Sequence, residues 1–272
     1  MKVRSIINLV KWFLKYRRLG LPIQYYNNAS YLDWFINWRP YLIKYKNKHE
    51  GEDCFIIGNG PSLNKTNLSL LNDYHVFGLN KIHLIFDSHK LQLSYHVAVN
   101  PLVIEQIDEV LQKNVFNCPS FLSFHGSKKF TYDKNKILKI NTSGSWTFHH
   151  SILEKINEGY TVTYVAMQIA FFMGFKNVFL VGVDHNFQQI GNPNEQQEFK
   201  GDDVNHFHPD YFKGMQWHLA DLEGNEASYS LARHQFHAFG RNIYDATIDG
   251  KLNIFQKIDF KDALEKANKK VI

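Results

Sequence analysis

The chain has 272 residues, of which 44% are hydrophobic and 21% are charged, and its formal net charge is +5. This composition is that of an ordinary globular protein and excludes a disordered or fibrous chain. Two cysteines, Cys54 and Cys118, exclude a disulfide framework and favour a reducing compartment. No apolar run is as long as a membrane span, and the N-terminus lacks the features of a signal peptide, so we expect a cytoplasmic protein.

The first element along the chain is a helix expected over residues 1–18, which ends before Gly20 and Pro22. Its basic residues fall on one narrow face and its apolar residues on the opposite half, as in a helix that lies peripherally on the anionic inner face of a cell membrane. The apolar half could equally dock on the protein itself or on a second subunit, so membrane contact and a homo-oligomer both stay open. The basic face consists of Arg4, Lys11, Lys15 and Arg18.

The pattern of the chain changes near residue 50. Residues 1–50 are predicted to form an N-terminal amphipathic helical extension, and from 51 to 272 strands alternate with helices. Such alternation is typical of a mostly parallel sheet with helices on both faces, so we predict a Rossmann-like α/β domain over 51–272. The expected strands are 54–57, 75–79, 95–99, 121–124, 178–181 and 242–247, and the expected helices are 102–111, 162–173, 225–239 and 259–270.

A short apolar run over 54–57 ends in the sequence Gly58-Asn59-Gly60-Pro61-Ser62. Two glycines two residues apart allow a tight turn and bring backbone N–H groups close to a phosphate. The pattern lacks the third glycine of the dinucleotide fingerprint and the Lys-Ser/Thr pair of a P-loop. A plain turn between two elements is therefore an equal alternative to a nucleotide-binding loop.

Asparagines follow three of the expected strands. Asn59, Asn80 and Asn100 stand just after the first, second and third of them. The carboxyl ends of parallel strands meet at one edge of a sheet, where ligands bind. One such asparagine is an ordinary turn residue, but three together predict a ring of amides that contacts a base, a ribose and a phosphate.

Two threonines and one aspartate are expected at the same edge. Thr161 is a candidate N-cap of the helix 162–173, and with Thr163 it would hold a nucleotide at the positive helix end. Asp184 stands three residues after the strand 178–181, at the end of the stretch 178–184. It could hold a metal, orient a sugar hydroxyl or bridge backbone N–H groups, and we favour an orienting or structural role because no second acidic residue stands nearby to complete a metal pair.

Residues 185–220 are predicted to form a long lid loop rich in histidine. His206, His208 and His218 could bind zinc, but no thiolate accompanies them and their spacing matches no standard zinc module, so we predict no metal site here. A lid histidine over an active site is better suited to act as a general base. Both His206 and His208 are candidates for the catalytic base, and we favour His206.

These motifs together resemble two related families over about residues 53–256: the bacterial lipo-oligosaccharide sialyltransferases and a family described as 6-hydroxymethylpterin diphosphokinase-like, whose domain also occurs in flagellin glycosyltransferases. The resemblance rests on the sequence from Ile56 to Leu63, on Asn80, on Asn100-Pro101, and on the segment 166–184 with its Gly-Val-Asp ending. One departure is Thr161-Val-Thr163, where the sialyltransferases have Thr-Ser-Gly.

The resemblance implies a glycosyltransferase that moves a sugar, such as sialic acid or a related nonulosonate, from a CMP-sugar or similar nucleotide sugar to a surface glycan or glycolipid. It implies that the three asparagines contact the nucleotide, that a lid histidine deprotonates the acceptor, that Tyr211 substitutes for a tyrosine that holds the donor phosphate, and that no cofactor is required.

Two alternatives stay open. One is a pyrophosphokinase that uses Mg²⁺ and ATP, for which Asp184, Asp202 and Asp203 would supply carboxylates. The other is a non-catalytic scaffold that binds a nucleotide sugar. Nucleic acid is not an expected partner, because basic residues cluster at the two termini and not along one aromatic-lined face.

Overall fold

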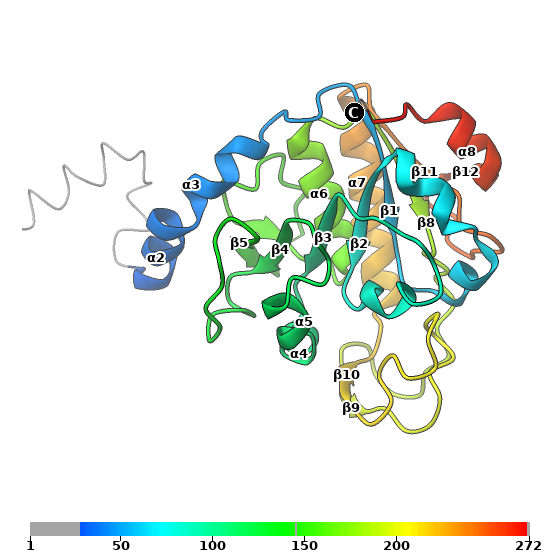
Figure 1. The fold of residues 1–272 in the computed structure, drawn as a ribbon, viewed down its shortest axis with the longest axis horizontal. Coiled ribbons are helices and arrows are strands. Elements are labelled where there is room, and N and C mark those ends of the chain that lie inside the picture. The colour runs from blue at the N-terminus through cyan, green and yellow to red at the C-terminus, as the bar shows by residue number, and fades with distance from the viewer. Residues whose placement is uncertain (1–27, 145, 271–272) are drawn as a thin grey trace, which may run out of the picture.

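The computed structural model describes residues 28–144 and 146–270 (Figure 1). Its centre is an eight-stranded sheet in the order β12-β11-β8-β1-β2-β3-β4-β5, in which each neighbouring pair is parallel. The expectation of a mostly parallel Rossmann-like sheet is confirmed. The strands are β1 Asp53–Ile57, β2 His75–Leu79, β3 Tyr95–Ala98, β4 Ser120–Ser123, β5 Ile137–Ile140, β8 Asn177–Val181, β11 Asn242–Asp245 and β12 Gln256–Lys257.

Two small sheets accompany the large one. A parallel pair, β6 Thr142–Ser143 and β7 Ile156–Asn157, follows β5, and an antiparallel pair, β9 Gln196–Glu198 and β10 Gln216–His218, lies within the lid. The α-helices are α2 Ala29–Asn37, α3 Arg39–Leu42, α4 Pro101–Gln106, α5 Asp108–Gln112, α6 Val162–Met173, α7 Leu222–Ala238 and α8 Phe260–Lys266. The 3₁₀ helices are η2 Ile43–Tyr45, η3 Pro61–Lys65, η4 Leu68–Asp73 and η5 Ile82–Ile85.

The sheet is buried on both faces, as its apolar strands require. In β1, Cys54 and Ile56 face one hydrophobic cluster, whereas Phe55 and Ile57 face the other. The first cluster lies beneath α2, α3, α6 and α7, and the second beneath η4, α4, α5 and α8. The alternation along one strand therefore builds a three-layer α/β sandwich.

The order of the strands reverses at β1. From β1 the chain continues outward through β2, β3, β4 and β5, and it then crosses to β8 on the other side of β1. In open parallel sheets, ligands bind outside the carboxyl ends of the strands at such a reversal. The loop after β1 and the ends of β2 and β8 are therefore where a ligand site is expected.

Helix α6 is buried over nearly its whole length because it is enclosed by the sheet and α7. Thr161 has extended backbone, and its side chain accepts a hydrogen bond from the N–H of Thr163, which makes it the N-cap as expected. Gly174 ends the helix with a φ of +94°, in the left-handed region that favours glycine. These two residues set the bounds of α6.

The segment before β1 is part of the core of the sheet rather than an appendage to it. Trp34 of α2 is fully buried, and its indole N–H donates to the carbonyl of Lys139 in β5 at 2.9 Å. Leu42 and Tyr45 belong to the same hydrophobic cluster as α6. Figure 1 shows α2 and α3 at the β5 end of the sheet. The helix expected over 1–18 lies outside the described residues.

The lid projects beyond one edge of the sheet, at the bottom of Figure 1. It contains the short β9–β10 hairpin, and its aromatic residues Phe207, Tyr211, Phe212 and Trp217 are buried against the rest of the domain. The lid is thus anchored to the second hydrophobic cluster of the domain. Within the described part of the chain, no helix combines the length and the apolar character needed to cross a membrane.

Candidate active site

The loop after β1 is fastened to the end of β8. The N–H of Gly58 donates to the carbonyl of Val181 at 2.8 Å, and the N–H of Gly60 donates to the carbonyl of Gly182 at 2.9 Å. A Cβ on Gly58 would lie 2.3 Å from the carbonyl oxygen of Gly182. A Cβ on Gly60 would instead meet the side chain of Asp184. Gly58 is therefore required by the packing of two backbones and Gly60 by the Asp184 carboxylate, and the expectation that these two N–H groups face a phosphate is wrong.

Asp184 holds the same loop from β8. Its carboxylate accepts hydrogen bonds from the N–H of Ser62 at 3.0 Å and from the hydroxyl of Ser62 at 2.7 Å. Burial raises the pKa of Asp184, and the two hydrogen bonds from Ser62 oppose that effect. Of the roles that the sequence left open for Asp184, the geometry matches the bridging one. Ser62 and Pro61 are not among the described residues that line a cavity beside this loop.

Asn59 and Asn80 each bury a side-chain oxygen that has no hydrogen-bond partner among the described residues. The backbone carbonyl of Asn59 accepts a hydrogen bond from the N–H of Phe207 in the lid at 2.9 Å. Asn59 also lines a cavity between this loop and the lid. Because buried polar atoms are rarely left unpaired, these two oxygens at the strand reversal are candidate acceptors for hydrogen bonds from a ligand.

Asn100 differs from the other two asparagines. Its Oδ1 accepts from the N–H of Leu102, which caps α4, and its Nδ2 lies 3.1 Å from Nδ1 of His218 in the lid. Asn100 therefore joins the end of β3 to the lid. It lines the same cavity as Asn80, so the three asparagines converge on one region as expected.

Two adjoining cavities occupy this region. The larger cavity has a volume of about 540 Å³ and lies between the end of β3, the N-terminus of α6 and the β10 strand of the lid. The smaller cavity has a volume of about 120 Å³ and lies between the loop after β1, the end of β8 and the lid. The residues that line both are Asn80, Thr161, Val162, Phe187, His206 and Asn225.

The N-terminus of α6 forms the wall between the cavities. Thr161 lines both of them and Thr163 lines the smaller one, with its side chain near the hydroxyl of Tyr229. A helix N-terminus carries a partial positive charge and favours an anion. No lysine or arginine is among the described residues that line either cavity, so an anionic ligand would depend on this helix end and on neutral donors.

His206 lies where the two cavities meet. Its Nδ1 is 2.8 Å from Oδ2 of Asp203, a carboxylate with no exposed side-chain surface. Because a carboxylate can only accept, Nδ1 carries the proton, and Nε2 is left as the basic nitrogen of the neutral ring. A histidine oriented by a buried carboxylate is the arrangement of a general base.

Aromatic rings fix the plane of His206. The ring of Tyr211 lies parallel to it, with centroids 4.1 Å apart, and Phe212 meets it edge-on at 5.2 Å. Tyr211 is itself buried, and its hydroxyl accepts a hydrogen bond from the N–H of Lys81. The expectation that Tyr211 holds a donor phosphate is wrong for this structure, because the tyrosine packs behind the histidine and lines neither cavity.

His208 is directed elsewhere. Its Nδ1 accepts a hydrogen bond from the N–H of Asp210, two residues further along the lid, and it is not among the residues that line the cavities. Of the two histidines that the sequence left open as bases, only His206 has both a carboxylate partner and a place in the cavity wall.

Sequence reasoning missed several residues of the site. Asp203 was considered only as a metal ligand. Its position three residues before His206 is close enough in sequence for the two side chains to form a hydrogen bond. Trp146 and Tyr160 lie at the larger cavity with rings 5.1 Å apart, and both are about half exposed. Neither follows an expected strand, so no pattern in the sequence identified them.

His96 positions Asn80 from behind. Asn80 has a φ of +50°, and its carbonyl accepts a hydrogen bond from Nε2 of the fully buried His96 at 2.8 Å. The ring stacks on Phe116, and Nδ1 lies 3.2 Å from the hydroxyl of Ser120. Burial lowers the pKa of His96 to about 3, so the ring is neutral at ordinary pH.

We expect this histidine to make folding stability depend on pH. In the unfolded chain it titrates near the ordinary value, so between about pH 6 and pH 4 the unfolded state binds one more proton than the folded state. Stability is then lost as the pH falls, by about 1.4 kcal/mol per pH unit. Urea unfolding of the wild type and of His96→Gln across this range measures the difference. Parallel slopes for the two proteins would contradict it.

The chain matches one known protein family in sequence. The sequence model of the family described as 6-hydroxymethylpterin diphosphokinase MptE-like matches residues 24–189, so the match includes part of the segment before β1. No curated protein matches the chain.

Two solved structures match the chain. MAf glycosyltransferase from Magnetospirillum magneticum AMB-1 is 12% identical with a TM-score of 0.52, and the match covers 90% of this chain and 42% of that protein. The chain thus spans less than half the length of MAf. The sialyltransferase CstII from Campylobacter jejuni, solved with cytidine-5'-monophosphate, is 14% identical with a TM-score of 0.46, covering 77% of this chain and 85% of that one.

Proposed function

The chain belongs to the 6-hydroxymethylpterin diphosphokinase MptE-like family, and on that premise we propose that it is a glycosyltransferase that moves a sugar from a nucleotide sugar to a hydroxyl group of a glycan acceptor. The observation that carries the proposal is the His206–Asp203 pair at the junction of two cavities, one of which is lined by Asn59 and Asn80, each with a buried and unpartnered amide oxygen. Its fold, which it shares with a glycosyltransferase, also supports this role.

The reaction needs a base and a means to stabilise the leaving group. The chain offers a histidine for the first and a helix N-terminus for the second. Nε2 of His206 takes the proton of the acceptor hydroxyl, and the oxygen attacks the anomeric carbon of the donor sugar. The bond between that carbon and the phosphate oxygen breaks, and the nucleotide leaves with the electron pair. Negative charge grows on the phosphate, which the N-terminus of α6 near Thr161 stabilises.

The two cavities suit different parts of this reaction. The larger cavity falls within the usual range for ligand pockets, whereas the smaller one is below it, so we assign only part of the nucleotide to the smaller cavity. The oxygens of Asn59 and Asn80 would accept from ribose hydroxyls or from the amino group of a base. We keep a CMP-sugar as the favoured donor, because the sequence resembles sialyltransferases.

The larger cavity suits the acceptor. Trp146 and Tyr160 expose aromatic faces at its wall, and such faces can stack on sugar rings. A glycan or glycolipid acceptor would reach His206 from this side. Membrane contact through residues 1–18, a peripheral position at the inner face of the membrane and self-association stay predictions, because those residues lie outside the described ones.

The carboxylates expected for a magnesium-dependent pyrophosphokinase do not form a cluster. Asp184 binds Ser62, Asp203 binds His206, and Asp202 is exposed and pairs with Lys213 at 2.9 Å. A kinase site needs carboxylates that are directed at a shared Mg²⁺ site, where the metal also binds phosphate oxygens. The separate engagement of these three side chains favours the transferase, for which we propose that no metal cofactor is required.

Nucleotide binding tests the proposal directly. A thermal-shift panel of CMP, CDP, UDP, GDP and ATP, each with and without Mg²⁺, should show stabilisation by CMP that does not depend on Mg²⁺. At 100 times Kd the gain is about 2.7 kcal/mol, enough to raise Tm by about 5 to 10 °C in a chain of this size. A shift that appears only with ATP and Mg²⁺ would favour the pyrophosphokinase instead.

Replacing Asn59 with leucine should separate binding from stability. The change removes a buried oxygen that has no partner, so the free protein should unfold at the same Tm or a higher one. CMP affinity should fall by about 5- to 150-fold, the equivalent of about 1–3 kcal/mol. Asn72→Leu is the matched control, since Asn72 bonds to the backbone of Lys90 and Gln92 away from both cavities. If Asn59→Leu binds CMP with unchanged affinity, the nucleotide does not bind in this cavity.

A further inference from the structure

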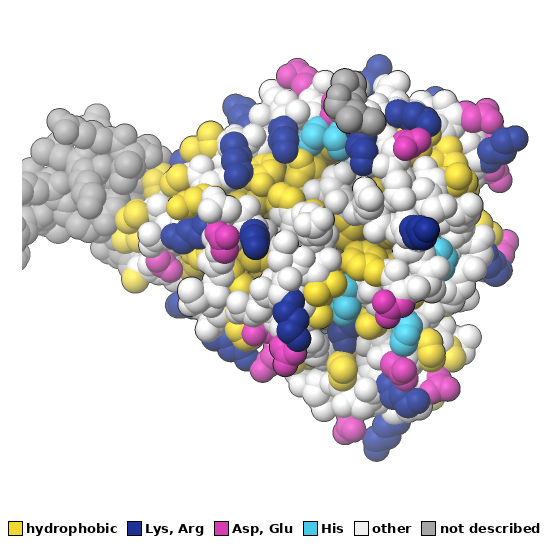
Figure 2. Space-filling model, in the orientation of Figure 1, with side chains coloured by type: hydrophobic (Ala, Val, Ile, Leu, Met, Phe, Trp, Pro, Cys, Tyr) yellow, Lys and Arg dark blue, Asp and Glu magenta, His cyan; other side chains and the backbone are white. Residues whose placement is uncertain are grey.

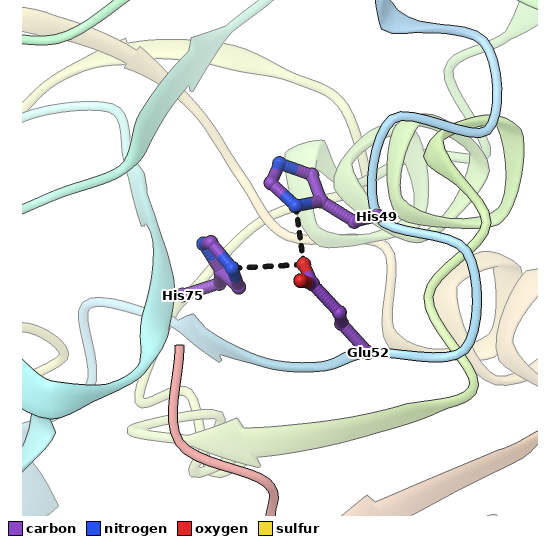
Figure 3. A group of neighbouring side chains, drawn as sticks. All are labelled: His49, Glu52 and His75. Atoms are coloured by element: carbon purple, nitrogen blue, oxygen red, sulfur yellow. Dashed lines mark hydrogen bonds and ion pairs between the residues drawn. The ribbon is translucent and has the colours of Figure 1, made fainter. Parts of the chain in front are cut away.

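A second cluster of chemically active side chains lies at the opposite, amino edge of the sheet. His49 and Glu52 precede β1, and His75 is the first residue of β2. Figure 3 shows both imidazole rings directed at the carboxylate of Glu52, which lies between them. Oε2 of Glu52 is 2.5 Å from Nδ1 of His49 and 3.0 Å from Nε2 of His75.

We propose that His49, Glu52 and His75 bind a divalent cation of the zinc class. The three ligand atoms lie within 4.8 Å of one another, which allows all three to reach one ion after small movements. Two imidazole nitrogens and one carboxylate oxygen are a donor set that zinc accepts, with a fourth position left for water. Within the described residues, this is the one group of three histidine, cysteine or acidic side chains close enough to share an ion.

Both imidazoles are largely buried, whereas the carboxylate between them is partly exposed. Lys48 and Lys270 lie near the rings, and their positive charge opposes a cation. The exposed fraction of Glu52, 36%, leaves the site open to solvent ions.

The second nitrogen of His49 has a partner that fits this role. Nε2 lies 2.6 Å from the hydroxyl of Tyr95 in β3, and the ring stacks on Phe175 with centroids 4.6 Å apart. Histidines that bind metals usually donate their other N–H to such an oxygen, which fixes the tautomer and the orientation of the ring. The competing interpretation is a triad held by hydrogen bonds alone, in which both rings donate to Glu52.

A bound cation would strengthen a contact that already exists between the segment before β1 and the start of β2. The segment 47–51 is bonded to the end of α6, through the N–H groups of Asn47, His49 and Gly51. An ion shared with His75 would tie this segment to β2 as well. Figure 2 shows histidine side chains reaching the surface at the upper edge of the molecule, among lysine and arginine side chains. The expected role is stabilisation of the fold at a distance from the cavities.

Metal binding to the full chain, freed of metal by a chelator and dialysed, tests the proposal. Calorimetry should show one equivalent of Zn²⁺ bound per chain, and Co²⁺ should give the intense visible absorption of a four-coordinate site. Zn²⁺ at 100 times Kd should raise Tm by about 5 to 10 °C, whereas Mg²⁺, which prefers oxygen ligands, should not. Absence of Zn²⁺ binding by the wild type would overturn the proposal.

Variants identify the ligands. Glu52→Gln keeps the shape of the side chain and should weaken Zn²⁺ binding by more than the roughly 10- to 100-fold cost of losing an outer partner of a metal site. His234 and His237 are exposed and three residues apart in α7, the spacing of His49 and Glu52, so the double change to alanine is the matched control. If the control abolishes binding and Glu52→Gln retains it, the ion is an adventitious one at surface histidines. CMP stabilisation, measured in the same variants, should stay unchanged whichever result the metal gives.

Discussion

Replacing His206 with asparagine is expected to lower the rate of sugar transfer by about 10²- to 10⁴-fold, the usual contribution of a general base. The asparagine amide can still donate to Asp203, as Nδ1 of the histidine does at 2.8 Å, but it has no basic nitrogen in place of Nε2. The variant therefore keeps the buried carboxylate paired while it removes the group that takes the proton.

The measurement is the steady-state rate with a CMP-sugar and a glycan acceptor, together with CMP binding by thermal shift. The loss should appear in kcat, while the nucleotide still binds. His208→Asn is the matched control, because His208 lies two residues away in the same lid and outside the cavity walls. Its rate should match that of the wild type.

A third variant tests the role of the carboxylate. Asp203→Asn should leave His206 in place but remove its preference for the Nδ1 proton, so the rate should fall while CMP still binds. If all three variants transfer sugar at the wild-type rate, His206 is not the base. If the wild type binds CMP and transfers no sugar to any acceptor, the chain is a scaffold that binds nucleotides.

The sheet could be predicted from the sequence because its strands are buried on both faces. Such strands are short apolar runs bounded by polar residues, and the expected bounds of β2, 75–79, agree with the structure. β5 was missed because Lys139 interrupts its apolar run. That lysine is buried, and its ammonium group donates to the carbonyls of Ser127 and Phe130. No local pattern reveals that a lysine will find such partners.

Helix boundaries followed their caps where the caps are strong. Thr161 and Gly174 fix α6 where it was expected, whereas the helix expected over 102–111 is divided at Ile107 into α4 and α5. No proline or glycine lies at Ile107 that would predict the break. Propensity alone therefore could not distinguish one helix from two short ones.

The convergence of Asn59, Asn80 and Asn100 could be predicted because parallel strands end at the same edge of a sheet. The side chains on the inner face of the lid could not be predicted in this way. Which of His206 and His208 points inward, and whether Tyr211 faces the cavity or packs behind it, depends on how the lid folds on its own aromatic residues. That folding has no periodic signal in residues 185–220, so sequence reasoning left both histidines open and assigned Tyr211 wrongly.

The glycines after β1 are the other point on which the sequence was undecided, and one substitution separates the two interpretations. Gly58→Ala would bring a Cβ to 2.3 Å from the carbonyl oxygen of Gly182 and 2.9 Å from its carbonyl carbon. The clash is with backbone rather than with a flexible side chain, so β1 and β8 would have to separate where the N–H of Gly58 donates to Val181. Overpacking of this kind costs about 3 kcal/mol, which lowers Tm by about 6 to 12 °C.

Thermal or urea unfolding of Gly58→Ala against the wild type measures the effect without any ligand. Gly144→Ala is the control, since a Cβ there has no atom within 4 Å and should leave stability nearly unchanged. A fall in stability for Gly58→Ala alone means that the glycine serves the contact between β1 and β8, and that any loss of CMP binding follows from a displaced loop. If the free protein keeps its Tm and only CMP binding is lost, the glycine instead serves the close approach of the ligand, and the loop itself contacts the phosphate.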